Sequence, residues 1–278
     1  MCEPGDEVLL PKPYWVSYPE QIKLAGAKVV EMTPEDTTGL KITAAQLERA
    51  VTPKTRLLIL NSPNNPSGAV YSRAELDAIA QVIRKSGIYV LSDEIYDKIC
   101  FGNTAFATMT VYDDIRDQVI YVNGVSKTFA MTGWRIGFLA AHRDIAAAVS
   151  HYQGHSTSNP TSISQKAALE GYRADKSFLA EMVRAFQERR DYIAARLSAI
   201  SGVRCAPPQG AFYAFPDFSA YYGAHGICSS MDLCGYLIEK FNVAIVPGVA
   251  FGMDSHSRLS FAASLQNIEK ALDRIEAG

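Results

Sequence analysis

The chain has 278 residues, of which 48% are apolar and 20% are charged, and this composition supports a sizeable core in one large or two smaller domains. The formal net charge is −2 and no basic run is present, so we expect neither nucleic acid nor a membrane as a partner. The chain shows no long apolar run and no signal-peptide pattern, and its five cysteines are scattered. We therefore expect free thiols and a cytoplasmic location.

Two histidines have a spacing that could serve a metal site. His151 and His155 are four residues apart, a spacing that places two side chains on one face of a helix. Gly154 lies between them, no third ligand is evident, and the cysteines lack metal-ligand spacing. The sequence therefore predicts no bound metal.

Strands and helices are predicted to alternate along the first half of the chain. Capping boxes at Thr43/Gln46 and Ser72/Glu75 start two helices, and Gly87 ends the second. Continuous apolar runs indicate strands that are buried on both faces, as in a parallel sheet. The expected strands are residues 7–10, 28–32, 56–60, 88–91, 119–122 and 136–141.

Polar side chains follow three consecutive strands of this predicted sheet. Asn65, Asp93 and Lys127 each lie a few residues beyond a strand, about one strand–helix unit apart. Parallel strands end at the same edge of a sheet, so an amide, an acid and an amine are expected to converge on one crevice. A lysine in such a crevice can lose solvent, which lowers its pKa and frees its amine for Schiff-base chemistry.

Two further side chains suit the same crevice. Arg135 follows Lys127 closely and could hold a phosphate group, and Trp15 follows the first strand and offers a flat face to a planar ring. Taken singly, Asn65 also fits an ordinary turn residue and Trp15 a core or lid aromatic.

A phosphate loop at Lys127 is excluded because its glycines are absent, and without that loop a magnesium role for Asp93 is disfavoured. A dinucleotide-binding fold is disfavoured because G-x-G-x-x-G is absent.

The second half of the chain is predicted to be helical and then α+β. One long helix is expected over residues 164–201. Arg258 lies in the last expected strand, where an exposed ion pair is its ordinary explanation. We expect a large α/β domain over residues 1–170 and a linker helix with a smaller α+β domain over 171–278. The short elements expected after the helix are strands at 203–205, 211–215, 243–246 and 257–262 and helices at 231–241 and 267–275.

Several motifs between about Pro4 and the C-terminus carry a family resemblance. They are Pro13-Tyr14-Trp15, Asn64-Asn65-Pro66-Ser67-Gly68, Ser92-Asp93-Glu94-Ile95-Tyr96, Ser126-Lys127 with Met131-Thr132-Gly133-Trp134-Arg135-Ile136-Gly137, Ser156-Thr157-Ser158-Asn159-Pro160-Thr161, and Arg258-Leu259-Ser260-Phe261-Ala262. With these motifs the chain resembles the class I/II, fold-type I aminotransferases that use pyridoxal 5′-phosphate. It is most similar to the bacterial aspartate aminotransferase subgroup.

The resemblance implies catalytic roles for residues already singled out. Lys127 would bind the cofactor covalently and move the proton. Asp93 would pair with the protonated pyridine nitrogen. Tyr96, together with Asn65, would hydrogen-bond the ring hydroxyl oxygen.

The resemblance also implies binding roles. Trp15 would stack on the cofactor ring, Arg135 would hold the cofactor phosphate, and Arg258 would form a bidentate pair with the substrate α-carboxylate. Trp15, Asn65 and Arg258 would contact the substrate. The implied reaction moves an amino group between an L-amino acid, aspartate-like in the nearest subgroup, and a 2-oxo acid, in a homodimer.

The sequence departs from the family pattern in two places. Family members are longer at the N-terminus, and the segment absent here would carry an edge strand and a glycine-containing loop before a helix that holds the phosphate. We therefore expect weak cofactor binding, low turnover and an exposed, aggregation-prone edge at residues 135–141. The second departure is Gly124, where many relatives have a phosphate-binding serine.

Two alternatives share these motifs. A carbon–sulfur β-lyase would use the same cofactor with the same lysine and aspartate. An inactive, truncated chain that acts as a binding or dimerising module would account for the absent N-terminal loop.

Overall fold

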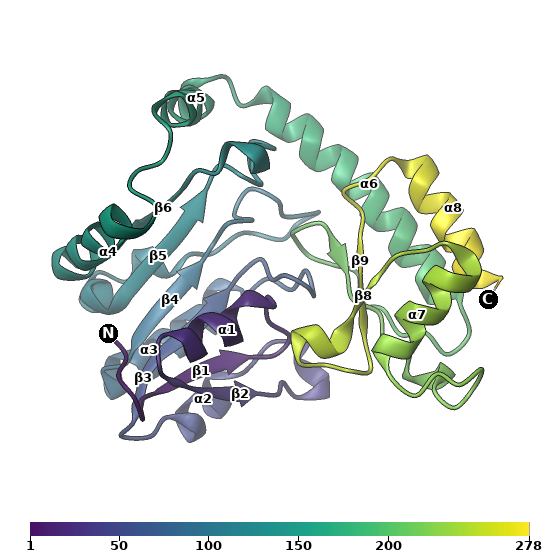
Figure 1. Cartoon of the computed structure of the whole chain (residues 1–278), viewed down its shortest axis with the longest axis horizontal. Helices are drawn as coiled ribbons and strands as arrows, with labels where there is room; N and C mark the ends of the chain where they lie inside the picture. Colours follow the sequence, from purple (N-terminus) through teal and green to yellow (C-terminus); the bar gives the residue numbers. More distant parts are fainter. Residues whose placement is uncertain (278) are drawn as a thin grey trace.

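The computed structural model describes residues 1–277 and has a six-stranded sheet at the centre of its N-terminal part (Figure 1). The strands are β1 (Glu7–Pro11), β2 (Lys28–Met32), β3 (Thr55–Asn61), β4 (Tyr89–Asp93), β5 (Val119–Gly124) and β6 (Gly137–Ala140). Their order is β2-β1-β3-β4-β5-β6, with β6 antiparallel to β5 and every other pair parallel. The predicted mixed, mostly parallel α/β sheet is therefore confirmed.

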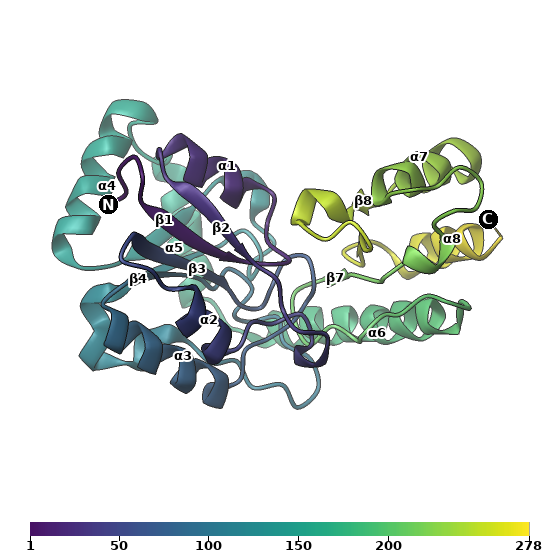
Figure 2. The same ribbon diagram turned by 90° about the horizontal axis from the view of Figure 1, so that it is seen from below.

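Helices cover both faces of this sheet, as Figure 2 shows. On one face α2 (Ala44–Ala50) and α3 (Arg73–Ser86) pack over Leu58 and Leu60, and on the other α1 (Ser17–Leu24) packs over Leu57 and Ile59. Because successive side chains point to opposite faces, the apolar run of β3 serves both cores.

The predicted helix signals are present as hydrogen bonds. Thr43 Oγ1 accepts a hydrogen bond from the Gln46 backbone N–H at 3.1 Å, and Ser72 Oγ accepts one from Glu75 at 3.3 Å. Both capping boxes are complete. Gly87 ends α3 with a left-handed φ of 74°, a conformation that favours glycine.

The long helix expected over residues 164–201 is wrong, because the chain forms two helices there. They are α5 (Ser162–Arg173) and α6 (Ser177–Ala199), and both follow α4 (Arg143–Ser156). Lys176 Nζ donates to the carbonyls of Gly171, Tyr172 and Ala174 at 2.7–3.0 Å. Asp175 accepts a hydrogen bond from the Ser177 backbone N–H at 3.2 Å. These local side-chain bonds satisfy the helix ends and compete with continuation of the helix.

The C-terminal part has its own core and a second, three-stranded antiparallel sheet in the order β7-β9-β8. The strand expected at residues 203–205 is wrong, since Arg204 forms a single bridge with Asp217. The helices expected at 231–241 and 267–275 are confirmed within one or two residues. The elements are β7 (Tyr213–Ala214), α7 (Ser230–Phe241), β8 (Val246–Pro247), β9 (Ser257–Ser260) and α8 (Leu265–Glu276).

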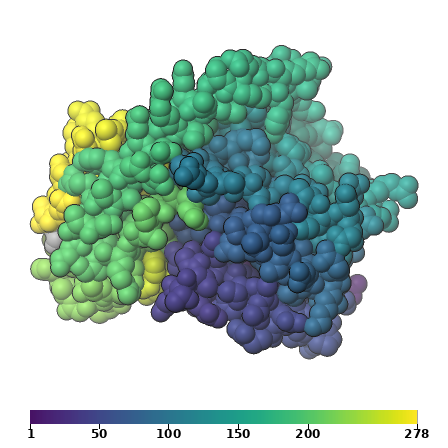
Figure 3. Space-filling model, turned by 180° about the vertical axis from the view of Figure 1, so that it is seen from behind, coloured from purple at the N-terminus to yellow at the C-terminus, as the bar shows by residue number. Residues whose placement is uncertain are grey.

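The two parts lie directly against each other, as the space-filling view shows with the C-terminal part in green and yellow (Figure 3). Backbone bonds cross between them from Gln209 N to the Gly68 carbonyl at 2.9 Å and from Tyr14 N to the Phe251 carbonyl at 3.3 Å. The division at residue 170 stays a prediction.

Short 3-10 helices complete the fold at Asp36–Thr38, Met109–Val111, Asp113–Gln118, Thr132–Trp134, Ser219–Tyr221 and Gly248–Phe251. Within residues 1–277, no helix combines the length and apolar character needed to cross a membrane.

Strand β6 forms an edge of the large sheet, as expected for residues 135–141. Within residues 1–277, β6 pairs with β5 alone. Phe138 on β6 is 42% exposed, and no residue of α4, the helix that follows β6, is buried. An exposed apolar edge strand is a template for pairing with another chain.

Phe138→Lys should reduce self-association, because a charge on an edge strand opposes strand pairing. The free energy of unfolding should fall by about 0.5–1.5 kcal/mol, because the Phe138 ring also packs against those of Tyr121 and Tyr172. Light scattering over a concentration series would measure the association. Val111→Lys, at a 44% exposed residue outside the large sheet, is the matched control and should associate like the wild type. Equal association of Phe138→Lys and wild type would contradict the prediction.

Candidate functional site

A cavity of about 670 Å³ lies where β3, β4 and β5 end and where β9 approaches them. This is the crevice expected at the carboxyl edge of a parallel sheet. It brings together every side chain singled out from the sequence: Trp15, Asn65, Asp93, Tyr96, Lys127, Arg135 and Arg258.

The amide of Asn61, the last residue of β3, connects two of the loops that form the cavity. Its Oδ1 accepts from the Asn65 backbone N–H at 2.9 Å, and its Nδ2 donates to the Asp93 carbonyl at 3.0 Å. Asn61 is buried, so these bonds fix the start of both loops. Asn61 is not among the predicted site residues, although a polar residue that ends an apolar strand is a signal for such a position.

Asp93 is held by two donors. The Tyr18 hydroxyl donates to Oδ2 at 2.6 Å, and the Ile95 backbone N–H donates to Oδ1 at 3.1 Å. Burial raises the pKa of Asp93 above its usual range, while these bonds and the nearby Lys127 ammonium act in the opposite direction. Burial, followed by the charge of Asp93, raises the pKa of Tyr18 well above its ordinary value. Tyr18 therefore remains a donor.

Lys127 is half-buried beyond the end of β5. Burial lowers the pKa of its amine, and the positive charges of Arg135 and Arg258 lower it further. Its Nζ lies 5.9 Å from the Tyr96 ring centroid and 5.7 Å from that of Phe212. A lysine in this environment has a larger fraction of neutral, nucleophilic amine than an exposed lysine.

Arg258 reaches the cavity from β9. Its Nη1 donates to Asn65 Oδ1 at 2.9 Å, and its guanidinium carbon lies 4.6 Å and 5.0 Å from the ring centroids of Tyr213 and Phe251. Its Nε is buried with no hydrogen-bond partner among residues 1–277. The ordinary explanation of Arg258 as a member of an exposed ion pair is therefore wrong. A buried cationic donor without a partner is costly, and an anionic ligand would satisfy it.

Two tyrosines form a buried pair in the cavity wall. The hydroxyl oxygens of Tyr96 and Tyr213 lie 2.9 Å apart. Burial, followed by Tyr213, raises the pKa of Tyr96 well above its ordinary value, so Tyr96 stays protonated at neutral pH. Tyr213 lies within the strand expected at residues 211–215, but no motif singled it out, because its partner Tyr96 is 117 residues away in the sequence.

Trp15 and Arg135 lie toward the open side of the cavity. Trp15 is 37% exposed, and its ring meets that of Tyr18 edge-on at 5.3 Å and 89°. Arg135 is exposed, has a left-handed φ of 54°, and donates from Nη1 to the Thr132 carbonyl at 3.0 Å. An exposed guanidinium fixed by its backbone is free to bind an anionic group.

The structure explains the glycine at position 124. A Cβ atom there would lie 2.8 Å from the Ile136 carbonyl oxygen and 3.0 Å from the Gly137 Cα. The pairing of β5 with β6 therefore leaves no room for a side chain. A serine at this position would require the two strands to move apart.

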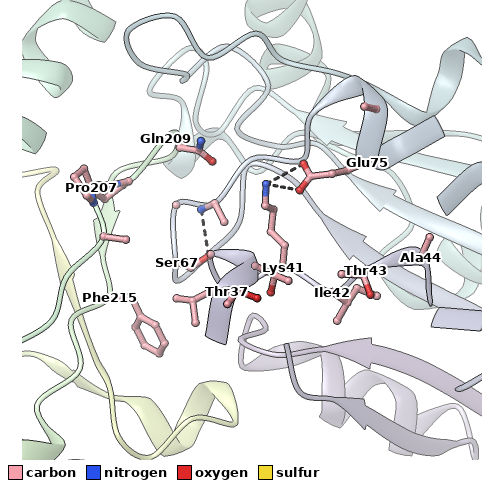
Figure 4. Close-up of a pocket in the computed structure, with 18 of the residues that line it drawn as sticks. Thr37, Lys41, Ile42, Thr43, Ala44, Ser67, Glu75, Pro207, Gln209 and Phe215 are labelled. Carbon is pink, nitrogen blue, oxygen red and sulfur yellow. Dashed lines mark hydrogen bonds and ion pairs between the residues drawn. The ribbon is translucent and has the colours of Figure 1, made fainter. Parts of the chain in front are cut away.

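A larger cavity, of about 770 Å³, lies elsewhere between the two parts (Figure 4). Its main charges are paired: Lys41 Nζ lies 2.7 Å and 2.9 Å from the two Glu75 carboxylate oxygens and donates to the Val70 carbonyl at 3.1 Å. In Figure 4, dashed lines join the Lys41 amine to the Glu75 carboxylate. Lys41 and Glu75 thus neutralise each other in the larger cavity, whereas the smaller cavity is lined by three cations, Lys127, Arg135 and Arg258.

The structure places His151 and His155 side by side on α4, with ring centroids 4.8 Å apart. Over residues 1–277, no group of three or more His, Cys, Asp or Glu side chains is arranged to hold a metal ion.

Comparison with known proteins gives one consistent result. The family model "Aminotransferase class I and II" matches residues 1–275. An aspartate aminotransferase of Bacillus sp. (strain YM-2) is 45% identical over 273 residues, which are 98% of this chain and 70% of that protein. The Bacillus subtilis aspartate aminotransferase is 43% identical over 98% of this chain and 69% of its own length.

Solved structures agree. The crystal structure of the Rhizobium meliloti aspartate aminotransferase has a TM-score of 0.95 at 39% identity and covers 100% of this chain, which spans 71% of that protein. The Thermus thermophilus aspartate aminotransferase with maleate has a TM-score of 0.91 at 37% identity over 99% of this chain and 70% of its own. The chain thus spans about 70% of these relatives.

Gly124→Ala should destabilise the protein by about 1–3 kcal/mol, the usual range for overpacking a tight site. Urea unfolding would measure the loss. Gly133→Ala, where an added Cβ meets nothing within 4 Å, is the matched control and should be nearly neutral. A Gly124→Ala protein as stable as the wild type would show that β5 and β6 separate easily.

Proposed function

Since this chain belongs to the class I and II aminotransferase family, we propose that it moves an amino group between an L-amino acid with an acidic side chain and a 2-oxo acid. We propose pyridoxal 5′-phosphate as its cofactor. The observation that carries the proposal is the convergence of Lys127, Asp93 and Arg258 on one cavity. The names of the relatives favour transamination over the β-lyase alternative.

An acidic substrate has support from the relatives. The proteins quoted above are aspartate aminotransferases, and one was solved with maleate, a four-carbon dicarboxylate like aspartate. A homodimer and a cytoplasmic location are proposed on the family resemblance.

The side chains present fit the proposed cofactor. Lys127 offers an amine with a lowered pKa to the aldehyde, and Asp93 offers a buried carboxylate to the ring nitrogen. Arg135 offers a cation to the phosphate, and Trp15 offers a partly exposed ring face. When bound, the cofactor withdraws electrons from the substrate α-carbon and makes its proton more acidic.

Each residue then has a separate task. Lys127 takes and returns the α-proton, because its amine is partly desolvated beside two cations. Asp93 keeps a negative charge opposite the ring nitrogen. Arg258 binds the substrate α-carboxylate with its planar guanidinium, which Asn65 and two aromatic rings hold in orientation. Tyr96, whose hydroxyl lies 2.9 Å from that of Tyr213, would hydrogen-bond the ring hydroxyl oxygen of the cofactor.

Lys127 should bind the cofactor covalently. Protein incubated with pyridoxal phosphate and reduced with borohydride should carry the pyridoxyl mass on the peptide that contains Lys127, as peptide mass spectrometry would show. Lys41, whose amine is paired with Glu75, should remain unlabelled. Labelling elsewhere, or none in folded protein, would favour the alternative of an inactive binding module.

Asp93→Asn should slow transamination of aspartate with 2-oxoglutarate by about 10²- to 10⁴-fold, because loss of a fixed charge partner costs about 3–5 kcal/mol in the transition state. A coupled assay would measure the rate. Asp97→Asn is the matched control, since Asp97 pairs with Lys98 and does not line the cavity. A near-normal rate for Asp93→Asn would reduce Asp93 to a structural acid.

A further inference from the structure

Tyr18 is the one side chain of α1 that meets both the acid and the aromatic face of the site. Its hydroxyl donates to Asp93 Oδ2 at 2.6 Å, and its ring meets Trp15 edge-on at 5.3 Å. It is 4% exposed, and its backbone N–H donates to the Trp15 carbonyl at 3.0 Å. Neither its hydroxyl nor its ring can leave these partners without opening the core beneath α1.

We propose that Tyr18 is a positioning residue that keeps Asp93 ionised and in place and that supports Trp15. The inference rests on the proposed function, since it gives Tyr18 its role through Asp93. A buried carboxylate favours its neutral form unless donors or cations oppose the burial. The titratable groups that face Asp93 are Tyr18 from α1, Tyr96 from its own loop and Lys127 from the loop after β5.

These three groups differ in how well they can stabilise the negative charge of Asp93. Lys127 cannot be a permanent partner, because its amine must be neutral and must react with the cofactor aldehyde. Tyr96 is engaged with Tyr213. The Tyr18 hydroxyl donates to Asp93, and burial together with the charge of Asp93 raises its pKa well above the ordinary value, so it stays protonated at neutral pH. It is the permanent side-chain donor to Asp93.

The sign of the pH effect follows from this bond. The hydrogen bond from Tyr18 lowers the pKa of Asp93, so its removal raises that pKa further. The carboxylate then becomes protonated at a higher pH, and cofactor affinity that depends on its charge falls at a higher pH.

The test is the affinity of the full chain for pyridoxal phosphate, titrated by absorbance and tryptophan fluorescence between about pH 5 and pH 9. Tyr18→Phe retains the ring and removes the hydroxyl. It should weaken binding about tenfold at neutral pH and move the acidic fall in affinity upward by about one pH unit. Circular dichroism would check the fold.

Tyr14→Phe is the matched control. Tyr14 is buried in the same segment and donates at 2.6 Å to Glu31 rather than to Asp93. It should leave both the affinity and its pH profile unchanged. If Tyr18→Phe behaves like Tyr14→Phe, the inference is overturned.

Two further variants separate the inference from the proposed function. If Asp93→Asn leaves cofactor affinity unchanged, the proposed role of Asp93 fails. If only Asp93→Asn weakens binding, the role of Tyr18 fails alone. The double variant Tyr18→Phe/Asp93→Asn has no carboxylate at position 93 and stays informative if Tyr18→Phe does not fold. It should bind as weakly as Asp93→Asn, and a clearly weaker affinity would show that Tyr18 does not act through Asp93.

Discussion

A parallel sheet that is buried on both faces leaves polar side chains one place to gather, the edge where its strands end. The rest of the site depends on how that edge is held. Asn61 binds the backbone after β3 and the backbone at the end of β4 with the same amide. Asn65 and Asp93 therefore keep a fixed separation, and Arg258 is placed through Asn65. A substitution at Asn61 would disturb groups that never contact it.

The cavity is lined by more cations than acids. Three cationic side chains, Lys127, Arg135 and Arg258, line it together with one acid, Asp93. Burial lowers the pKa of Lys127, and the positive charges of Arg135 and Arg258 lower it further. The same excess of positive charge suits a ligand that carries a phosphate and a carboxylate. Activation of the amine and recognition of anions thus come from one arrangement of charges.

Local patterns predicted the large sheet, both capping boxes and the place where the polar side chains converge. They failed where the determining contact is distant in sequence. The bond between Tyr18 and Asp93 joins residues 75 apart, and that between Arg258 and Asn65 joins residues 193 apart. The break between α5 and α6 comes from Lys176 folding back onto three carbonyls, which a smooth apolar stripe conceals. The pair formed by Tyr96 and Tyr213 likewise joins residues 117 apart, although Tyr213 lies within an expected strand.

The unpaired edge and the side of the cavity that holds Arg135 are formed by one short segment of the chain. Ile136 and Gly137 line the cavity at the start of β6, and Arg135 precedes them in a left-handed conformation. β6 is held on one side by its close approach to Gly124, and its other side has no partner within residues 1–277. A strand paired there would restrict β6 and, through it, the backbone that orients Arg135. If Arg135 holds the cofactor phosphate as proposed, a partner strand on β6 would change cofactor affinity as well as self-association, because the same four-residue strand governs both.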